Sequence, residues 1–186
     1  MKLYTYQINN DGVDRIGVEC SGWRGMLWPL EAFGLKFRDM HDLICHITPA
    51  QLSRIADAEN ATEGNALRLT NVRLRSPIPH PEQDIVCLGI NYADHAVESA
   101  RFHEQSFLLS REKATYFSKR AYETTGSGDP IPSYEGLVTE LDYEVELGVV
   151  IGKDCRKVSQ SEAPNYIFGY TIVNDVSARN LQTEHN

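Results

Sequence analysis

The stretch from Asp142 to Ile151 is the strongest constraint on the fold, because its acidic and apolar residues alternate. Successive side chains of a β-strand point to opposite faces, so Asp142, Glu144 and Glu146 are predicted to share one face. The opposite face would carry only apolar residues, namely Val145, Leu147, Val149 and Ile151. The downstream half is apolar on both faces, which predicts a central strand that is covered on both sides.

Carboxylates on such a strand require a compensating positive charge, because the burial of an anion is costly. Neighbouring carboxylates on one face lie roughly 6–7 Å apart, since each residue adds ~3.3 Å. Mg²⁺ and Ca²⁺ prefer oxygen ligands and would supply the charge. A solvated strand face with the same residues is the alternative, and the Glu-x-Glu pattern alone does not separate the two.

A further carboxylate, Asp175, follows an apolar strand predicted over residues 165–174. It has two interpretations: the N-cap of a helix that starts here, or a carboxylate that faces the same cavity as the glutamates of the first strand. Arg179 and Gln182 lie one and two helical turns further on. They could bind an anionic substrate or its carbonyl oxygens.

A histidine and a glutamate form a third pattern, on a helix predicted from about Asp94 to Arg101. His95 and Glu98 are three residues apart and share one helical face. A carboxylate beside an imidazole fixes its tautomer and favours general-base chemistry. The helix dipole opposes this in the first turn, because it disfavours the imidazolium form. A surface pair without function is the alternative, and taken alone this pattern favours it.

Two shorter segments lie between these motifs. Lys119 is a lone lysine at the end of a strand predicted over residues 116–119. The segment Gly126–Pro130 is glycine-rich but lacks the spacing of a phosphate-binding loop, so a turn is predicted.

Composition narrows the class of protein. The 186 residues carry a net charge of −8, which argues against a nucleic-acid surface. Four scattered cysteines predict buried, reduced thiols and a cytoplasmic location. The N-terminus lacks the apolar core of a signal peptide, and no apolar run is long enough to span a bilayer, so no membrane partner is expected.

The chain is predicted to have two domains, divided by a proline-rich connector at residues 76–81. Residues 1–75 would form a small α/β module, with a hairpin from strands at Lys2–Ile8 and Arg15–Cys20 and a helix that begins near Thr48. Residues 76–186 would form the second domain, which includes a short buried strand at Asp84–Gly89. The sequence from 177 onward reads as the start of a helix, so we expect the second domain to be incomplete at residue 186.

Taken together and in this order, the motifs resemble the fumarylacetoacetate hydrolase family. The matching segments are 88–95 with Glu98, 117–119, 142–147 with 150–153, 169–171 and 174–182. The resemblance covers roughly residues 76–186, and the first 75 residues look like the variable leading module of such enzymes. Asn180 departs from the pattern, since the family usually has an aspartate there.

The resemblance implies an α+β, mainly β fold: a mixed β-roll catalytic domain, usually dimeric, preceded by a small N-terminal domain. It also implies a bound Mg²⁺, with Mn²⁺ and Ca²⁺ as alternatives. By motif position the site residues are the metal carboxylates Glu144, Glu146 and Asp175, the water-activating dyad His95 and Glu98, the catalytic Lys119, and the substrate-binding Arg179 and Gln182.

The implied reaction is hydrolysis, decarboxylation or isomerisation of a small 2-oxo or dicarbonyl acid, such as an acylpyruvate, oxaloacetate or a hydroxylated dienoate. An ion on three carboxylates keeps open positions, polarises the carbonyl and stabilises an enolate, which suits C–C bond cleavage. The family's later catalytic lysine would lie past residue 186. The alternative is therefore a truncated member of the same family that binds metal without turnover.

Overall fold

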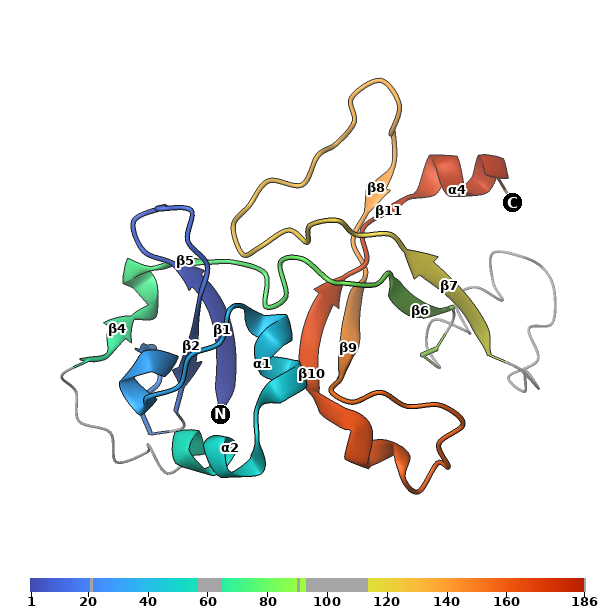
Figure 1. Cartoon of the computed structure of the whole chain (residues 1–186). Helices are drawn as coiled ribbons and strands as arrows, with labels where there is room; N and C mark the ends of the chain where they lie inside the picture. The colour runs from blue at the N-terminus through green and yellow to red at the C-terminus, as the bar shows by residue number, and fades with distance from the viewer. Residues whose placement is uncertain (21, 57–64, 90, 93–113, 186) are drawn as a thin grey trace. The chain divides into compact units, whose positions relative to one another are not determined.

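The computed structural model describes residues 1–20, 22–56, 65–89, 91–92 and 114–185 (Figure 1). They form two compact units: residues 1–79 together with 125–186, and residues 80–124. Among the described residues, every strand pairing is antiparallel, and helices are few and short. The expectation of a mainly β fold is thus confirmed, whereas the closed β-roll and the domain division at residue 75 remain predictions.

The first unit begins with a β-hairpin, as the sequence predicts. Strands β1 (Lys2–Gln7) and β2 (Arg15–Glu19) pair antiparallel around a turn that contains left-handed residues. Three short strands extend the hairpin into a five-stranded sheet of order β4-β3-β2-β1-β5. They are β3 (Met26–Pro29), β4 (Leu67–Arg68) and β5 (Arg73–Leu74).

Short helices follow the hairpin, and side chains cap two of them. These elements are η1 (Leu30–Phe33), α1 (Met40–His46), α2 (Pro49–Ala56) and, after β4, η4 (Leu69–Asn71). Asp39 caps α1 by accepting a hydrogen bond from the Asp42 N–H at 2.8 Å. Thr48 and Gln51 form the predicted capping box at α2, because each side chain accepts from the other's backbone N–H. The helix predicted near Thr48 is confirmed.

The hydrophobic core of the first unit lies between its N-terminal sheet and helices. Its buried residues are Ile16, Val18, Cys20, Trp28, Leu30, Leu35, Met40, Leu43 and Ile55. Phe168, from the C-terminal part of the unit, packs against this core. All four cysteines are reduced, but Cys45 and Cys155 are exposed, so the expectation of buried thiols is wrong for these two.

The C-terminal part of the first unit is a long two-stranded ribbon. Strand β9 (Val145–Ile151) pairs with β10 (Ile167–Asn174), and η5 (Ala163–Tyr166) precedes β10. A second, shorter ladder joins β8 (Leu141–Asp142) to β11 (Ser177–Ala178), and α4 (Arg179–His185) follows. The loop after β9 carries the exposed residues Arg156 and Lys157.

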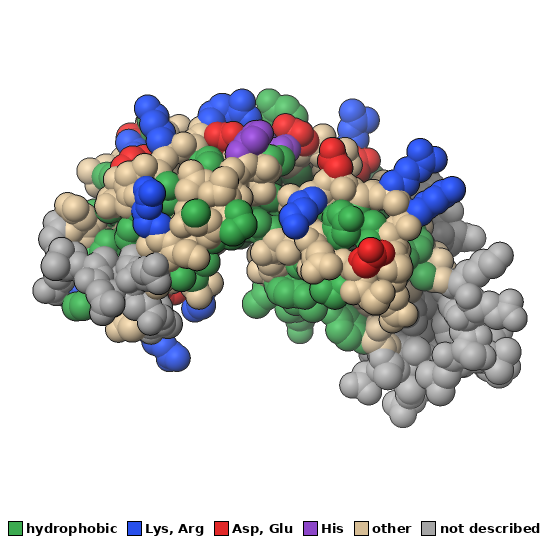
Figure 2. Space-filling model, turned by 60° about the horizontal axis from the view of Figure 1, so that its bottom comes forward, with side chains coloured by type: hydrophobic (Ala, Val, Ile, Leu, Met, Phe, Trp, Pro, Cys, Tyr) green, Lys and Arg blue, Asp and Glu red, His purple; other side chains and the backbone are tan. Residues whose placement is uncertain are grey.

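One face of the ribbon is apolar and exposed to solvent. Its side chains are between 48% and 78% exposed, and hydrophobic groups reach the surface in the space-filling view (Figure 2). They are Val145, Leu147, Val149, Ile151, Tyr170 and Ile172. The sequence predicts that β9 is covered on both faces, and this is wrong for the strand described here. No other described strand pairs with β9 or β10.

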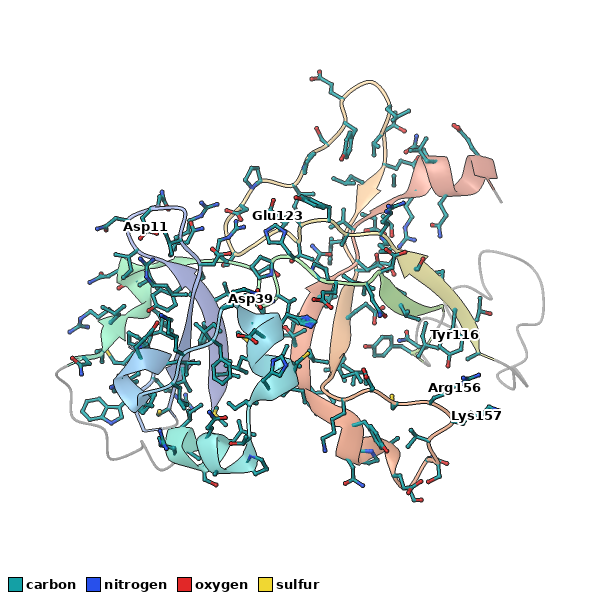
Figure 3. The ribbon with its side chains drawn as sticks, in the orientation of Figure 1. Asp11, Asp39, Tyr116, Glu123, Arg156 and Lys157 are labelled. Atoms are coloured by element: carbon teal, nitrogen blue, oxygen red, sulfur yellow. The ribbon has the colours of Figure 1, made fainter. Side chains whose placement is uncertain are left out.

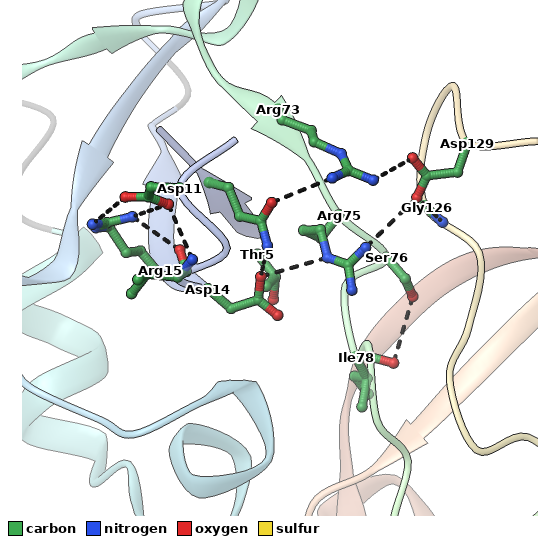
Figure 4. A network of polar contacts seen from close by, with 12 residues as sticks. Thr5, Asp11, Asp14, Arg15, Arg73, Arg75, Ser76, Ile78, Gly126 and Asp129 are labelled. Atoms are coloured by element: carbon green, nitrogen blue, oxygen red, sulfur yellow. Dashed lines mark hydrogen bonds and ion pairs between the residues drawn. The ribbon is translucent and has the colours of Figure 1, made fainter. Parts of the chain in front are cut away.

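A polar network attaches the loop before β8 to the N-terminal sheet (Figure 4). Arg73 Nη2 lies 2.8 Å from Asp129 Oδ1, and Arg75 lies between Asp129 and Asp14, at 3.7 Å and 3.5 Å. Asp129 also accepts a hydrogen bond from the Gly126 N–H at 3.2 Å, which closes a tight turn. The turn predicted for this glycine-rich segment is confirmed.

The second unit contains an antiparallel pair, β6 (Ile85–Gly89) and β7 (Thr115–Lys119). Both strands occur where the sequence predicts them. The prediction that β6 is buried is wrong, because Val86 is 70% exposed and Leu88 is 43% exposed. None of the helices within the described residues has both the length and the hydropathy that crossing a bilayer requires.

Candidate functional site

The acidic residues of the candidate site lie where the two ladders of the ribbon meet. Asp142 pairs with Ser177 in the short ladder, and Val145 pairs with Asn174 in the long one. Between them, the Asp175 N–H donates to the carbonyl oxygen of Glu144 at 2.7 Å. One register therefore runs through both ladders and places Glu144 opposite Asp175.

The strand predicted over 142–151 is interrupted at Glu144. The backbone N–H of Glu144 donates to the side-chain oxygen of Asn174 at 3.0 Å, which replaces a ladder hydrogen bond. The ladder resumes at Asp142, so the residues keep their alternation across the interruption. The prediction that Asp142, Glu144 and Glu146 share one side is consistent with this register.

The carboxylates lie on the less exposed side of the ribbon. Glu146 is opposite Val173, and both are partly buried, whereas Val145 and Leu147 are exposed on the other face. Gly148 continues the carboxylate side. A Cβ there would come within 2.9 Å of methyl groups of Thr171 and Val173, so glycine lets these cross-strand side chains pack closely.

Arg179 contacts two of the carboxylates on this side of the ribbon, Asp142 and Glu144. Its Nη2 lies 2.6 Å from Glu144 Oε1 and 2.9 Å from Asp142 Oδ2, and its Nε donates to the same Asp142 oxygen at 2.9 Å. Burial alone would lower the pKa of the guanidinium, but the hydrogen bond to Asp142 and the charge of Glu144 raise it. Arg179 therefore remains a full positive charge between two carboxylates.

Asp175 is a buried carboxylate, 8% exposed, immediately after β10. It is not the N-cap of a helix, because α4 begins at Arg179, four residues later. This outcome favours the interpretation in which Asp175 is held at a strand end. The burial of its carboxyl requires compensation by polar or positive groups nearby.

The types of side chain at the site suit a hard divalent ion, but the positions of those that the structure describes do not form a binding site for one. Glu144, Glu146 and Asp175 offer only carboxylate oxygens, the ligands that Mg²⁺ and Mn²⁺ accept, and the register places Glu144 opposite Asp175. Within the described residues, however, no group of three His, Cys, Asp or Glu side chains stands ready to hold a metal. Glu144 instead contacts Arg179, at 2.6 Å.

The other predicted site residues fall in different places. Gln182 lies on α4 and accepts a hydrogen bond from Arg179 Nη1 at 3.0 Å, so these two predicted substrate contacts are adjacent. Lys119 ends β7 in the second compact unit. His95 and Glu98 lie outside the described residues.

Sequence reasoning missed the role of Asn174 and the engagement of Asp142. Both belong to the motif segments, but no local pattern shows that an asparagine side chain replaces a backbone acceptor. The opposite charges of Asp142 and Arg179 were the available signal for their pairing.

Comparison with known proteins places this arrangement in a family. A family model described as fumarylacetoacetate (FAA) hydrolase C-terminal matches residues 84–186, more than half of the chain. The chain belongs to the fumarylacetoacetate hydrolase family. The resemblance seen in the sequence motifs is thereby confirmed.

Relatives of this fumarylacetoacetate hydrolase family member include bacterial proteins of greater length. The chain is 42% identical over 136 residues to oxaloacetate tautomerase YisK of Bacillus subtilis (strain 168), covering 73% of this chain and 44% of the relative. It is 34% identical over 131 residues to an uncharacterized protein of Staphylococcus aureus (strain USA300), covering 70% and 41%. The chain thus spans less than half the length of these curated relatives.

Solved structures of the fumarylacetoacetate hydrolase type share the fold. A fumarylacetoacetate hydrolase (EaFAH) from Exiguobacterium antarcticum is 30% identical, with a TM-score of 0.64, and the match covers 99% of this chain and 59% of that one. Maleylpyruvate hydrolase from Sphingobium sp. SYK-6, solved with manganese(II) and pyruvate, is 24% identical with a TM-score of 0.65, and the match covers 96% and 60%. The second likeness concerns the fold alone.

Proposed function

We propose that this chain forms the metal-binding part of an enzyme that acts on a small 2-oxo acid, and that its reaction is keto–enol tautomerisation. The observation that carries the proposal is the 42% identity to a relative named oxaloacetate tautomerase. This reaction differs from the C–C bond cleavage expected from the sequence, because tautomerisation moves a proton and leaves the carbon skeleton intact.

The residues of the site would have two roles, metal binding and substrate binding. Glu144, Glu146 and Asp175 would hold Mg²⁺ or Mn²⁺, and Arg179 with Gln182 would bind the substrate carboxylate. When bound, the ion supplies Lewis acidity toward the carbonyl oxygen of a 2-oxo acid. The adjacency of Arg179 and Gln182 on α4, linked at 3.0 Å, supports their joint role.

Hydrolysis of a C–C bond is the second candidate reaction. It is favoured by the 30% identity to a solved structure described as a fumarylacetoacetate hydrolase. His95 with Glu98 would then activate a water molecule, and Lys119 would contact the substrate. The third possibility is a metal-binding protein without turnover.

A pair of assays separates these three functions. The chain with Mn²⁺ is mixed with enol oxaloacetate, and loss of the enol's ultraviolet absorbance is followed. Pyruvate release from acylpyruvates is measured in parallel. Tautomerisation predicts accelerated enol loss without pyruvate release from acylpyruvates, and Glu146→Gln should reduce the rate by at least about 10²-fold, the size of a lost charge-stabilising contact.

The control is Asp154→Asn, which removes an exposed carboxylate on the loop after β9 and should keep full activity. Pyruvate release that exceeds enol loss would favour the hydrolase. Binding of Mn²⁺ with neither reaction would establish the non-catalytic alternative. Absence of Mn²⁺ binding would overturn the proposal as a whole.

A further inference from the structure

Arg179 and a divalent ion would compete for the same carboxylate. Glu144 Oε1 lies 2.6 Å from Arg179 Nη2, a charge-assisted contact that occupies one of the two oxygens with which Glu144 could bind a metal. A guanidinium at this distance also repels a second cation on the same carboxyl group. Each positive group therefore weakens the binding of the other at Glu144.

The attachment of Arg179 allows its side chain to leave while its backbone stays. The Arg179 N–H donates to the carbonyl oxygen of Glu140 at 2.8 Å, which continues the register of the ribbon beyond the short ladder. The side chain is 33% exposed, so it has access to solvent from its present position. Gln182, which already contacts Nη1, provides a neighbouring acceptor on the same helix.

We infer that Arg179 is the resident counter-ion of Glu144 in the metal-free protein and that metal binding displaces it. This inference rests on the proposed metal site. Arg179 offsets part of the negative charge of Asp142 and Glu144 in the metal-free protein, and Glu144, Glu146 and Asp175 would together hold the ion once it binds. Metal affinity is lower than the carboxylates alone would give, because each binding event must break the Arg179 contact.

The displacement of Arg179 by the metal can be observed by NMR on the unmodified 21.0 kDa chain. The Nε–H of Arg179 donates to Asp142 at 2.9 Å and should give a distinct arginine side-chain signal, assigned by its loss in Arg179→Lys. Diamagnetic Mg²⁺ is added stepwise. The signal is expected to move or disappear as Mg²⁺ is added and to stop changing once the site is saturated.

A calorimetric series with Mn²⁺ tests the competition independently. Arg179→Gln removes the competing charge and should lower the Mn²⁺ dissociation constant by about tenfold. Arg156→Gln is the matched control, since it removes an exposed arginine on the loop after β9 (Figure 3) and should leave the constant unchanged. Arg179→Lys, which keeps the charge, should bind Mn²⁺ within about threefold of the unmodified chain.

The outcomes separate this inference from the proposed function. If Mn²⁺ binds, and Glu144→Gln abolishes binding, but the Arg179 signal stays and Arg179→Gln binds no tighter, the exchange is wrong while the metal site stands. If neither Mn²⁺ nor Mg²⁺ binds the unmodified chain, the metal site itself is wrong. The NMR titration needs no folded Arg179→Gln variant, so a failure of that variant to fold leaves the exchange testable.

Discussion

Glu19 is a buried carboxylate on β2, 7% exposed, that local donors hold in its ionised form. It accepts hydrogen bonds from the Gly25 N–H at 2.6 Å and the Tyr4 hydroxyl at 2.8 Å. Lys2 lies 3.4 Å away. Burial alone would raise the pKa of Glu19, but these hydrogen bonds and the charge of Lys2 lower it below the ordinary value.

The lowered pKa predicts a stability difference that depends on pH. Glu19→Gln should lower the free energy of unfolding at pH 7 by about 1–3 kcal/mol, the usual worth of hydrogen bonds to a charged group. A depressed folded-state pKa stabilises above the unfolded value of about 4.3, and this stabilisation is lost as pH falls through the folded value. Urea unfolding at pH 7 and pH 3 checks this: the difference between the two proteins should shrink at pH 3, and an equal difference at both would contradict it.

At the scale of elements, a β-bulge decides which carboxylates meet. The register of β9 and β10 shifts between Ile167 and Gly169, so Phe168 is an extra residue in β10. Continued from the pair Ile151–Ile167 without the shift, the register would place Asp175 opposite Tyr143 rather than Glu144. A one-residue slip also moves side chains to the other face.

Because of this bulge, the faces of the strands could be predicted from the sequence but the pairing of Glu144 with Asp175 could not. The alternation of 142–151 predicted the faces of β9, and the apolar run before Asp175 predicted β10. The pairing of Glu144 with Asp175 depends on the one extra residue, whose packing against a distant core is a tertiary effect. The interruption at Glu144 likewise depends on a side-chain acceptor from the neighbouring strand.

The exposed apolar face of the ribbon predicts self-association of the chain. Leu147 and Ile172 are cross-strand partners and are 61% and 78% exposed. Ile172→Lys should weaken association, measured by sedimentation velocity over a concentration series, because it places a charge in the apolar face. The unfolding free energy should change by no more than about 0.5 kcal/mol.

Ser161→Lys serves as the control for added charge, since Ser161 is exposed on the loop before β10. Equal association of all three proteins would rule out this face as the contact. A dimer through this face would agree with the homodimer that the family resemblance implies.

At the scale of the whole molecule, Phe168 links the ribbon to the N-terminal core of the same compact unit. Gly152 makes room for it, because a Cβ there would lie 2.8 Å from the Phe168 Cβ. The covered or exposed state of each ribbon face could not be predicted from the strand pattern. An apolar face looks the same in the sequence whether or not another element covers it.

The link through Phe168 predicts that removal of this side chain makes unfolding of the ribbon and of the N-terminal module less cooperative. Phe168→Ala should lower stability by about 2 kcal/mol, less than for a fully buried phenylalanine because the side chain is only partly buried. Both tryptophans, Trp23 and Trp28, lie in the N-terminal module, so their fluorescence follows that module alone. Far-ultraviolet circular dichroism also follows the ribbon, and its transition should move to lower denaturant than the fluorescence transition.

Tyr170→Ala is the comparison, since this aromatic residue of β10 is 65% exposed and should leave the two transitions coincident. Coincident transitions in Phe168→Ala would show that the ribbon and the module are joined by other contacts, such as the ion pairs of Asp129.

At Glu144, the ribbon is held by a side-chain acceptor, Asn174, in place of a backbone carbonyl. A side-chain amide can rotate away and return, whereas a strand partner's carbonyl can move only with its whole strand. The ladders on either side have their own backbone pairing, which does not include this hydrogen bond. Because the Asp175 N–H still donates to the Glu144 carbonyl oxygen at 2.7 Å, release of the Asn174 contact would loosen Glu144 on one side only and would leave its place opposite Asp175 unchanged.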